Sequence, residues 1–355
     1  MQFNFDSLYP DKKLKATRRL LRDFWNNRIR TVYSSYPCEF EYRQAEDINE
    51  MAYLAAHNIE AGADMPGFNI PRLVADFGTV STAAYWGGKT YTPEGGRKWI
   101  DPIISGISDL EGLAAEDPEN LDVEKARRLW QDVSAIMGTS RLPCTTIDLQ
   151  GPLNTLALMW EQQDFMISMY ENPGKVHEAL EKVTDHLIRV IKALKRKIPM
   201  IEAPLWPYIW LPGDIGIGMT EDYMPLLSPE LYKEFGIPYV KRLSDEFGGL
   251  FIHCCGQFTQ HIDSLAESSI NILGMEFVYP HIDIPKLFKT FGSASVFVPN
   301  IMDKCIPEFG SMTGYYEYIE SLRTDDTRLW YVLRPDLPDF AEQVKLMDKI
   351  TDEIR

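Results

Sequence analysis

Apolar positions along the chain change their period several times, which predicts alternating helices and strands. Residues 172–194 carry Val, Leu and Ile at helical spacing behind an Asn-Pro pair, a common N-cap and first helical position. Further helices are expected from the Ser-Pro-Glu start at 228–230 and over 235–247. Short β-prone runs occupy residues 145–149, 249–253, 272–278, 295–298 and 329–333. Strands and helices alternating through short connections predict βαβ units and a parallel sheet.

This alternation, over 355 residues, fits the α/β class and specifically one (β/α)8 TIM barrel with an N-terminal helical extension. Residues 1–60 are strongly charged and carry apolar residues at helical spacing, so we expect a helical extension packed on the barrel. Residues 61–355 are expected to form the barrel domain. The glycine-rich segment 213–218 is expected to be a loop.

Charge and composition narrow the classes of partner. The chain is 45% hydrophobic and 25% charged, with a formal net charge of −16, which argues against nucleic acid or an anionic membrane and leaves a small-molecule substrate. No run approaches the length of a membrane span, and no basic segment followed by an apolar stretch opens the chain, so we expect a cytoplasmic protein. Five cysteines, two of them adjacent, indicate reduced thiols. Nothing in the sequence indicates an oligomeric state.

The sharpest candidate site lies at the end of the strand predicted over 249–253. In a parallel barrel the active site forms at the C-terminal ends of the strands. Side chains alternate along a strand, so His253 and Cys255 share the face of Phe251, while Cys254 points to the other face. An imidazole nitrogen and a thiolate are suitable ligands for Zn²⁺, and we expect both residues to be catalytic and metal-binding.

A catalytic zinc usually has a third protein ligand and an open position. Glu276, a carboxylate within an apolar strand, is the main candidate for that ligand and for acid–base catalysis, and the alternative is a structural ion pair with Arg334. The other candidates are Cys305 and Asp336, with His281 in reserve.

Four further polar residues are candidates at the barrel mouth. Asp214, in the glycine-containing loop, is a candidate proton donor, and Asp222 is either a substrate contact or a turn residue. Gln150 ends a strand before Gly-Pro and is expected to hydrogen-bond the substrate. Arg334, at another strand end, has the planar fork that holds a carboxylate or a phosphate.

Four motifs, taken in order, resemble the uroporphyrinogen decarboxylase superfamily. They read Asp-Leu-Gln-Gly-Pro at 148–152, Tyr-Glu-Asn-Pro-Gly-Lys-Val-His at 170–177, Leu-Ser-Pro-Glu-Leu-Tyr at 227–232 and His-Cys-Cys-Gly at 253–256. The resemblance covers roughly residues 140–350. It implies a TIM barrel and one of two chemistries, because the superfamily includes porphyrinogen decarboxylases and corrinoid-dependent methyltransferases that act on thiols.

The decarboxylase branch binds its polycarboxylate substrate through an N-terminal Arg-Gln-Ala-Gly-Arg motif. This chain reads Arg-Gln-Ala-Glu-Asp at 43–47, so acidic residues replace the glycine and the second arginine. Like charges beside a polycarboxylate repel it. We therefore expect Arg43 to be a solvent-facing helix residue. This departure from the motif disfavours uroporphyrinogen decarboxylase activity.

The methyltransferase branch carries His-x-Cys-Gly at this strand, which His253, Cys255 and Gly256 match. The resemblance implies a zinc ion that binds a thiol substrate and holds it as a thiolate toward a methyl donor, a corrinoid on a partner protein. The family's second cysteine, on the last strand, is absent from residues 329–336, and Cys305 is the candidate substitute. Three hypotheses stay open: this methyltransferase, a metal-free decarboxylase or lyase, and a non-catalytic tetrapyrrole-binding protein.

Overall fold

The centre of the molecule is a six-stranded parallel sheet with the strand order β1-β10-β9-β8-β7-β6. The structure is a computed structural model and describes residues 3–37, 47–94 and 97–351. The strands are β1 (Thr31–Ser35), β6 (Ile217–Thr220), β7 (Leu250–His253), β8 (Ile272–Tyr279), β9 (Val296–Ile301) and β10 (Arg328–Leu333). Most of their side chains are buried on both faces, as expected when helices cover a parallel sheet.

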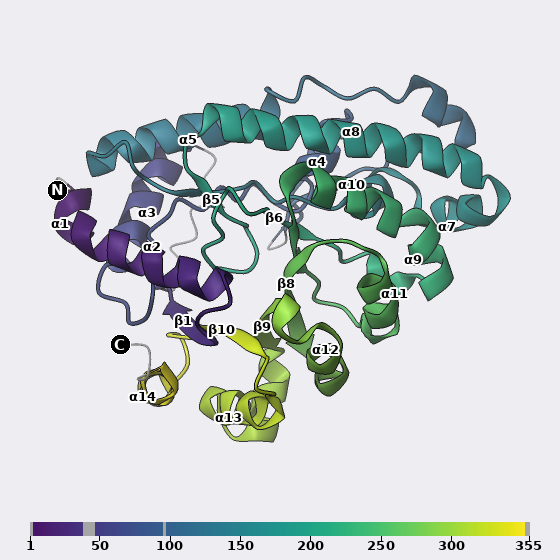
Figure 1. Cartoon of the computed structure of the whole chain (residues 1–355). Helices are drawn as coiled ribbons and strands as arrows, with labels where there is room; N and C mark the ends of the chain where they lie inside the picture. The colour runs from purple at the N-terminus through teal and green to yellow at the C-terminus, as the bar shows by residue number, and fades with distance from the viewer. Residues whose placement is uncertain (1–2, 38–46, 95–96, 352–355) are drawn as a thin grey trace.

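Each connection between these parallel strands contains helix, which confirms the predicted βαβ alternation. In Figure 1 these helices lie around the outside of the strands. They are α9 (Pro229–Phe235), α10 (Ile237–Phe247), α11 (Ile262–Glu267), α12 (Ile284–Phe291), α13 (Met312–Leu322) and, after the last strand, α14 (Phe340–Thr351). Ser228 caps α9 by accepting a hydrogen bond from the backbone N–H of Leu231, as the Ser-Pro-Glu start predicts.

The middle of the chain forms a smaller parallel sheet of two strands. Strands β4 (Cys144–Thr145) and β5 (Ile201–Ala203) pair with each other. Between them run α6 (Pro152–Met159), α7 (Gln162–Glu171) and the long α8 (Pro173–Lys197), which crosses the top of the view in Figure 1. Helix α8 begins at the predicted proline and buries the predicted apolar stripe. The remaining elements here are α4 (Ser81–Ala84), the antiparallel pair β2 (Thr90–Tyr91) and β3 (Trp99–Ile100), and α5 (Leu121–Met137).

The ladders of the described residues do not close into the expected eight-stranded barrel. The β4–β5 pair joins the main sheet only through a bridge from Gln150 to Thr220, and a second bridge links Leu73 to Cys144. Pro204, Pro207 and Pro212 follow β5 and lack the N–H groups that a longer ladder needs. The fold observed is therefore α/β with a parallel sheet, and β4 is shorter than the strand predicted over 145–149.

Two further expectations need correction. Residues 1–60 are not a helical extension only, because β1 lies between α2 (Asp11–Trp25) and α3 (Ile48–Ala61) and pairs with β10 in the main sheet. Its five residues are all buried, and the charges that flank them masked the strand signal. The glycine-rich segment 213–218, expected as a loop, runs into β6. Arg43 and its motif up to residue 46 lie outside the described residues.

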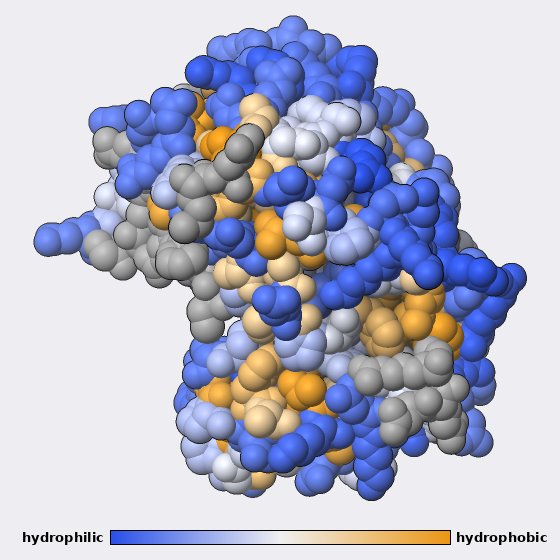
Figure 2. Space-filling view, turned by 90° about the vertical axis from the view of Figure 1, so that its left-hand side faces the viewer, coloured by the Kyte–Doolittle hydropathy of each residue, from blue (hydrophilic) through white to orange (hydrophobic). Residues whose placement is uncertain are grey.

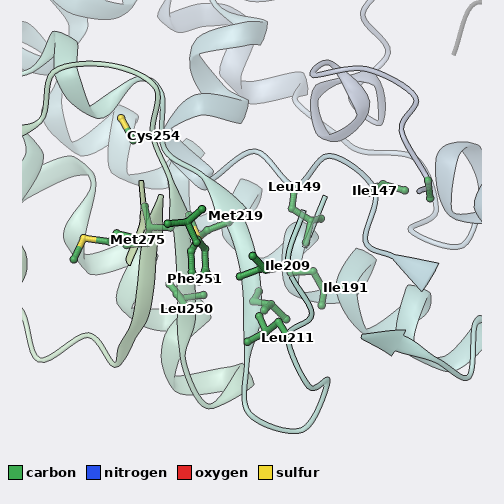
Figure 3. Packing of buried hydrophobic residues seen from close by; sticks show 14 of the residues in the cluster. Ile147, Leu149, Ile191, Ile209, Leu211, Met219, Leu250, Phe251, Cys254 and Met275 are labelled. Carbon is green, nitrogen blue, oxygen red and sulfur yellow. The ribbon is translucent and has the colours of Figure 1, made fainter. Parts of the chain in front are cut away.

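The buried core continues from the sheet into the loops after β4 and β5. Figure 3 shows Leu149, Ile209, Met219 and Phe251 among the buried side chains gathered there. Phe251 lies on β7 with its ring centroid 6.5 Å from that of Trp25 on α2. This packing leaves His253, two residues further on, at the end of the strand.

Hydrophilic side chains dominate the face that carries α1 (Phe5–Leu8), α2 and α3, with a band of apolar residues down its middle (Figure 2). Among the described residues, no helix combines the length and apolar character that crossing a membrane requires.

Candidate metal centre

Polar side chains line up across the C-terminal ends of neighbouring strands. In the parallel register, Thr220 of β6 is opposite His253 of β7, and His253 is opposite Glu276 of β8. Gln150 extends the row through its bridge to Thr220. Because parallel strands end at the same edge, residues distant in sequence meet there. The predicted residues Gln150, His253 and Glu276 are thus brought to one edge.

His253 is held by the carboxylate of Glu276. Nδ1 of His253 is in hydrogen-bond contact with Oε2 of Glu276, and Oε1 of Glu276 accepts a bond of 3.1 Å from the side-chain amide of Asn300 on β9. A carboxylate only accepts hydrogen bonds, so this contact places a proton on Nδ1. Nε2 is the ring nitrogen left for a ligand.

Asp222 and Cys255 meet from the loops that follow β6 and β7. Oδ1 of Asp222 accepts a bond of 2.8 Å from the backbone N–H of Cys255 and one of 3.3 Å from its thiol. Both side chains are exposed. His281 contacts the same turn, since its Nδ1 lies 2.7 Å from the carbonyl oxygen of Cys255.

Asp222, His253 and Cys255 form a cluster of potential metal ligands, with one donor atom from each lying within 4.8 Å of the others. A carboxylate oxygen, an imidazole nitrogen and a thiol sulfur match the donors that zinc takes in proteins, and three ligands leave the open position of a catalytic site. Metal-bound histidines usually donate their other N–H to a carboxylate, and here Glu276 accepts that hydrogen bond from His253. On donor chemistry and on this outer contact, the residues fit a zinc ion.

Negative charge and burial shape the electrostatics of the cluster. Burial lowers the pKa of His253, but Glu276, Cys255 and Asp222 outweigh burial and hold that pKa well above 6.5. The same groups that favour a proton on the ring also favour a cation beside it.

Two buried carboxyl groups nearby have raised pKa values. Burial, with a contribution from Asp76, raises the pKa of Asp148 to about 7. Burial also raises the pKa of Glu221 to about 8, although the hydroxyl of Tyr232 donates to it at 3.0 Å. The edge of the sheet therefore holds acids that titrate near neutral pH.

Aromatic side chains close one side of the cluster. The ring of Trp206, from the proline-rich loop after β5, lies 6.3 Å from that of His253, and Tyr208 lies 5.0 Å from Trp206 between ring centroids. Both aromatic residues come from this one loop, so the loop after β5 lies against the candidate ligand His253.

Asp214, predicted to be catalytic, lies away from this cluster. It precedes β6, whose first residue pairs with the first residue of β7, and so belongs to the opposite end of the strands from His253. Its carboxylate forms a two-pronged ion pair with Arg22 of α2, at 3.0 and 3.1 Å. The position of the residue at a strand start, rather than a strand end, accounts for the difference.

Arg334 follows β10, as predicted, but its guanidinium is engaged. It donates to Asp336 at 2.7 and 2.9 Å and to Asp303 at 2.9 Å. The expected alternative of an Arg334–Glu276 ion pair is wrong, because Glu276 faces His253. Asp336, a candidate ligand, is occupied by the same arginine.

The other cysteines of the described residues are buried, and Cys254 and Cys255 differ in exposure as strand alternation predicts. Cys254 is fully buried beside Cys255, which is exposed. Cys305, the candidate substitute for the missing last-strand cysteine, lies in a 3-10 helix over Asp303–Phe309 and is also buried. Neither belongs to the ligand cluster of the described residues.

Gln150 is buried and bound within the protein. Its amide donates to Asp148 at 2.6 Å, and its oxygen accepts from the side chain of Asn154 at 3.0 Å. Both ends of the Gln150 amide are therefore engaged by neighbouring side chains, and a direct substrate contact is not what these bonds indicate.

Sequence reasoning missed the possible metal-binding role of Asp222 and missed Asn300 altogether. Asp222 was expected to contact substrate, not metal, because β6 was interpreted as a loop and the strand end before Glu221 went unrecognised. Asn300, the last residue but one of β9, carries a similar signal, a polar residue after an apolar run. A search for polar residues after every short apolar run would have found both.

Comparisons with known proteins provide evidence on the fold of the chain and none on its chemistry. No protein-family model and no curated protein matches the chain. Among solved structures, the chain is similar to a methyltransferase from Methanosarcina mazei, with a TM-score of 0.65 and 14% identity. The similarity covers 95% of this chain and 98% of the other. At this identity the match shows a shared fold over nearly the whole length of both proteins.

Proposed function

We propose that Asp222, His253 and Cys255 bind zinc and that the chain is an enzyme of the methyltransferase type. In this proposal a methyl group moves between a corrinoid, carried by a partner protein, and a small acceptor such as a thiol. The observation that carries the proposal is the cluster of nitrogen, sulfur and oxygen donors within 4.8 Å, with Glu276 on the far nitrogen of His253. The ordered motifs support a relation to the uroporphyrinogen decarboxylase superfamily, and the shared fold supports a methyltransferase-like protein.

When bound, zinc would lower the pKa of a thiol acceptor and keep it as a thiolate. The residues of the chain prepare that position. Glu276 fixes the tautomer of His253 and directs Nε2 outward, while Asp222 holds the turn that presents the Cys255 thiol. Trp206 lies beside the imidazole ring, 6.3 Å away between ring centroids.

The metal-free decarboxylase alternative finds less support at this edge. A polycarboxylate substrate needs unpaired cations, and the guanidinium of Arg334 is neutralised by Asp303 and Asp336. Asp222 adds a negative charge to the ligand cluster, and this charge would repel a polycarboxylate.

Elemental analysis of the purified protein tests the proposal. We expect about one zinc per chain in the wild type and its loss in His253→Ala and Cys255→Ser, with Cys254→Ser as the matched control that retains it. A second measurement follows methyl transfer from methylcobalamin to a small thiol by the change in corrinoid absorbance. Folded wild-type protein that takes up no zinc, even when zinc is supplied, would contradict the proposal.

A further inference from the structure

Arg72 is a buried cation fixed at one end of its guanidinium. The residue is only 7% exposed, and its Nη1 donates to the hydroxyl of Tyr36 at 3.0 Å and to the carbonyl of Ile209 at 3.2 Å. Two acceptors on one nitrogen hold the planar group in a defined orientation. The guanidinium is therefore positioned, not merely enclosed.

The other edge of the same guanidinium faces no acceptor from the described residues. Nε and Nη2 are both buried and have no hydrogen-bond partner among the described residues. A buried N–H left without an acceptor costs about 1–3 kcal/mol, and more when it carries charge. Nε and Nη2 point their hydrogens in parallel, which is the geometry that binds the two oxygens of a carboxylate.

Two aromatic rings pack against this cation. The guanidinium lies 4.3 Å from the ring centroid of Tyr36 and 5.6 Å from that of Tyr208. Within the described part of the chain, no acidic side chain forms an ion pair with Arg72. Ring faces stabilise a cation only partly, so its positive charge remains available to an anion.

A cavity adjoins Arg72. Its volume is about 50 Å³, and its lining includes Tyr9, Tyr36, Asn58, Asn69, Arg72 and Tyr208. One water molecule needs roughly 10–15 Å³ on this measure, so the space accommodates a molecule of a few heavy atoms. Tyr208 also lies beside Trp206, whose ring centroid is 6.3 Å from that of His253, so two aromatic rings separate the cavity from the candidate metal centre.

We propose that the Nε–Nη2 edge of Arg72 binds the carboxylate of a small organic acid in this cavity. The planar, two-oxygen group meets both unpartnered N–H groups at once, and Tyr36 and Tyr208 cover its short carbon chain. This site does not depend on the metal centre, because none of its residues belongs to the zinc cluster.

Isothermal titration calorimetry with acetate tests the site. The titration uses chelator-treated full-length protein at constant ionic strength, so that acetate cannot bind through a metal. We expect saturable binding by the wild type, binding weakened by at least about tenfold in Arg72→Lys, which keeps the charge but loses the fork, and none in Arg72→Gln. Cys255→Ser should bind acetate as the wild type does.

Acetamide provides a control on the ligand side, with the shape of acetate but no charge. It should neither bind nor compete, and this comparison holds even where an Arg72 variant fails to fold. Folded wild-type protein that shows no saturable acetate binding would overturn the proposal. Equal affinity in a folded Arg72→Gln variant, or equal binding of acetamide, would overturn it as well. Zinc binding is measured separately, so failure of one proposal leaves the other standing.

Discussion

Oδ1 of Asp222 accepts hydrogen bonds from both the backbone N–H and the thiol of Cys255, at 2.8 and 3.3 Å. The two residues are 33 positions apart and follow neighbouring parallel strands. This double contact fixes the turn after β7 so that the thiol stays beside the imidazole of His253. The candidate metal centre therefore rests on the pairing of β6 with β7.

The outer contact of His253 predicts the effect of Glu276→Gln. The amide loses the negative charge that adds to the basicity of the imidazole, and it leaves only one acceptor oxygen to orient the ring; such partners typically contribute 10- to 100-fold in metal affinity. We expect zinc affinity, measured by competition with a chromophoric chelator, to fall by about that factor. Glu267→Gln, which removes an exposed carboxylate paired with Lys233, should leave it unchanged. Equal affinities in both variants would rule out this role of Glu276.

The adjacent cysteines should differ in reactivity. Cys255 is exposed, whereas burial and the charge of Asp222 raise the pKa of the Cys254 thiol well above its ordinary value. Brief treatment with iodoacetamide at neutral pH should alkylate Cys255 before Cys254, because the thiolate is the nucleophile. Peptide mass spectrometry locates the label, and added zinc should protect Cys255. Comparable labelling of both thiols in folded protein would contradict the arrangement.

Gly151 should tolerate no larger side chain. A methyl group there would lie 1.6 Å from Oε1 of the buried Glu221 and 2.6 Å from the side chain of Met219. Such overpacking costs about 1–3 kcal/mol, so Gly151→Ala should lower the free energy of unfolding by that amount in urea titrations. Gly174→Ala is the control, since Gly174 lies in α8 with nothing within 4 Å of the added atom. Its stability should stay equal or rise by up to about 1 kcal/mol.

His186 predicts a loss of stability in mild acid. It is buried in α8 between Tyr85 and Trp86, and burial lowers its pKa from 6.5 to about 4. The unfolded chain binds a proton on this residue near pH 6.5 and the folded chain does not, so stability is retained above pH 6.5 and falls as the pH drops toward 4. The residue should contribute roughly 2 kcal/mol to the difference in unfolding free energy between pH 7 and pH 5.

A His186→Phe variant checks this contribution, because it keeps an aromatic ring and removes the titrating group. Urea unfolding at pH 7 and pH 5 should show a smaller pH dependence in the variant than in the wild type. An unchanged dependence in His186→Phe would show that other groups dominate.

The sequence by itself determined those features that depend on local periodicity. A long apolar stripe behind Asn-Pro marks α8. The alternation expected from Phe251 onward separates exposed Cys255 from buried Cys254, although β7 itself ends at His253. Because parallel strands end at a common edge, the sequence alone predicted that His253 and Glu276 lie close together. These conclusions need only the chain's own spacing and the handedness of its elements.

Tertiary structure alone decided which side chains meet between elements. Asp222 reaches Cys255 only because β6, hidden in a glycine-rich segment, pairs with β7, and β1 joins the sheet by pairing with β10 almost 300 residues later. Asp214 and Arg334, equally plausible in sequence, form ion pairs with Arg22, Asp303 and Asp336. Spacing along the chain fixes the face on which a side chain lies, but strand register and loop path fix its neighbour, and the chemistry of a site depends on the neighbour.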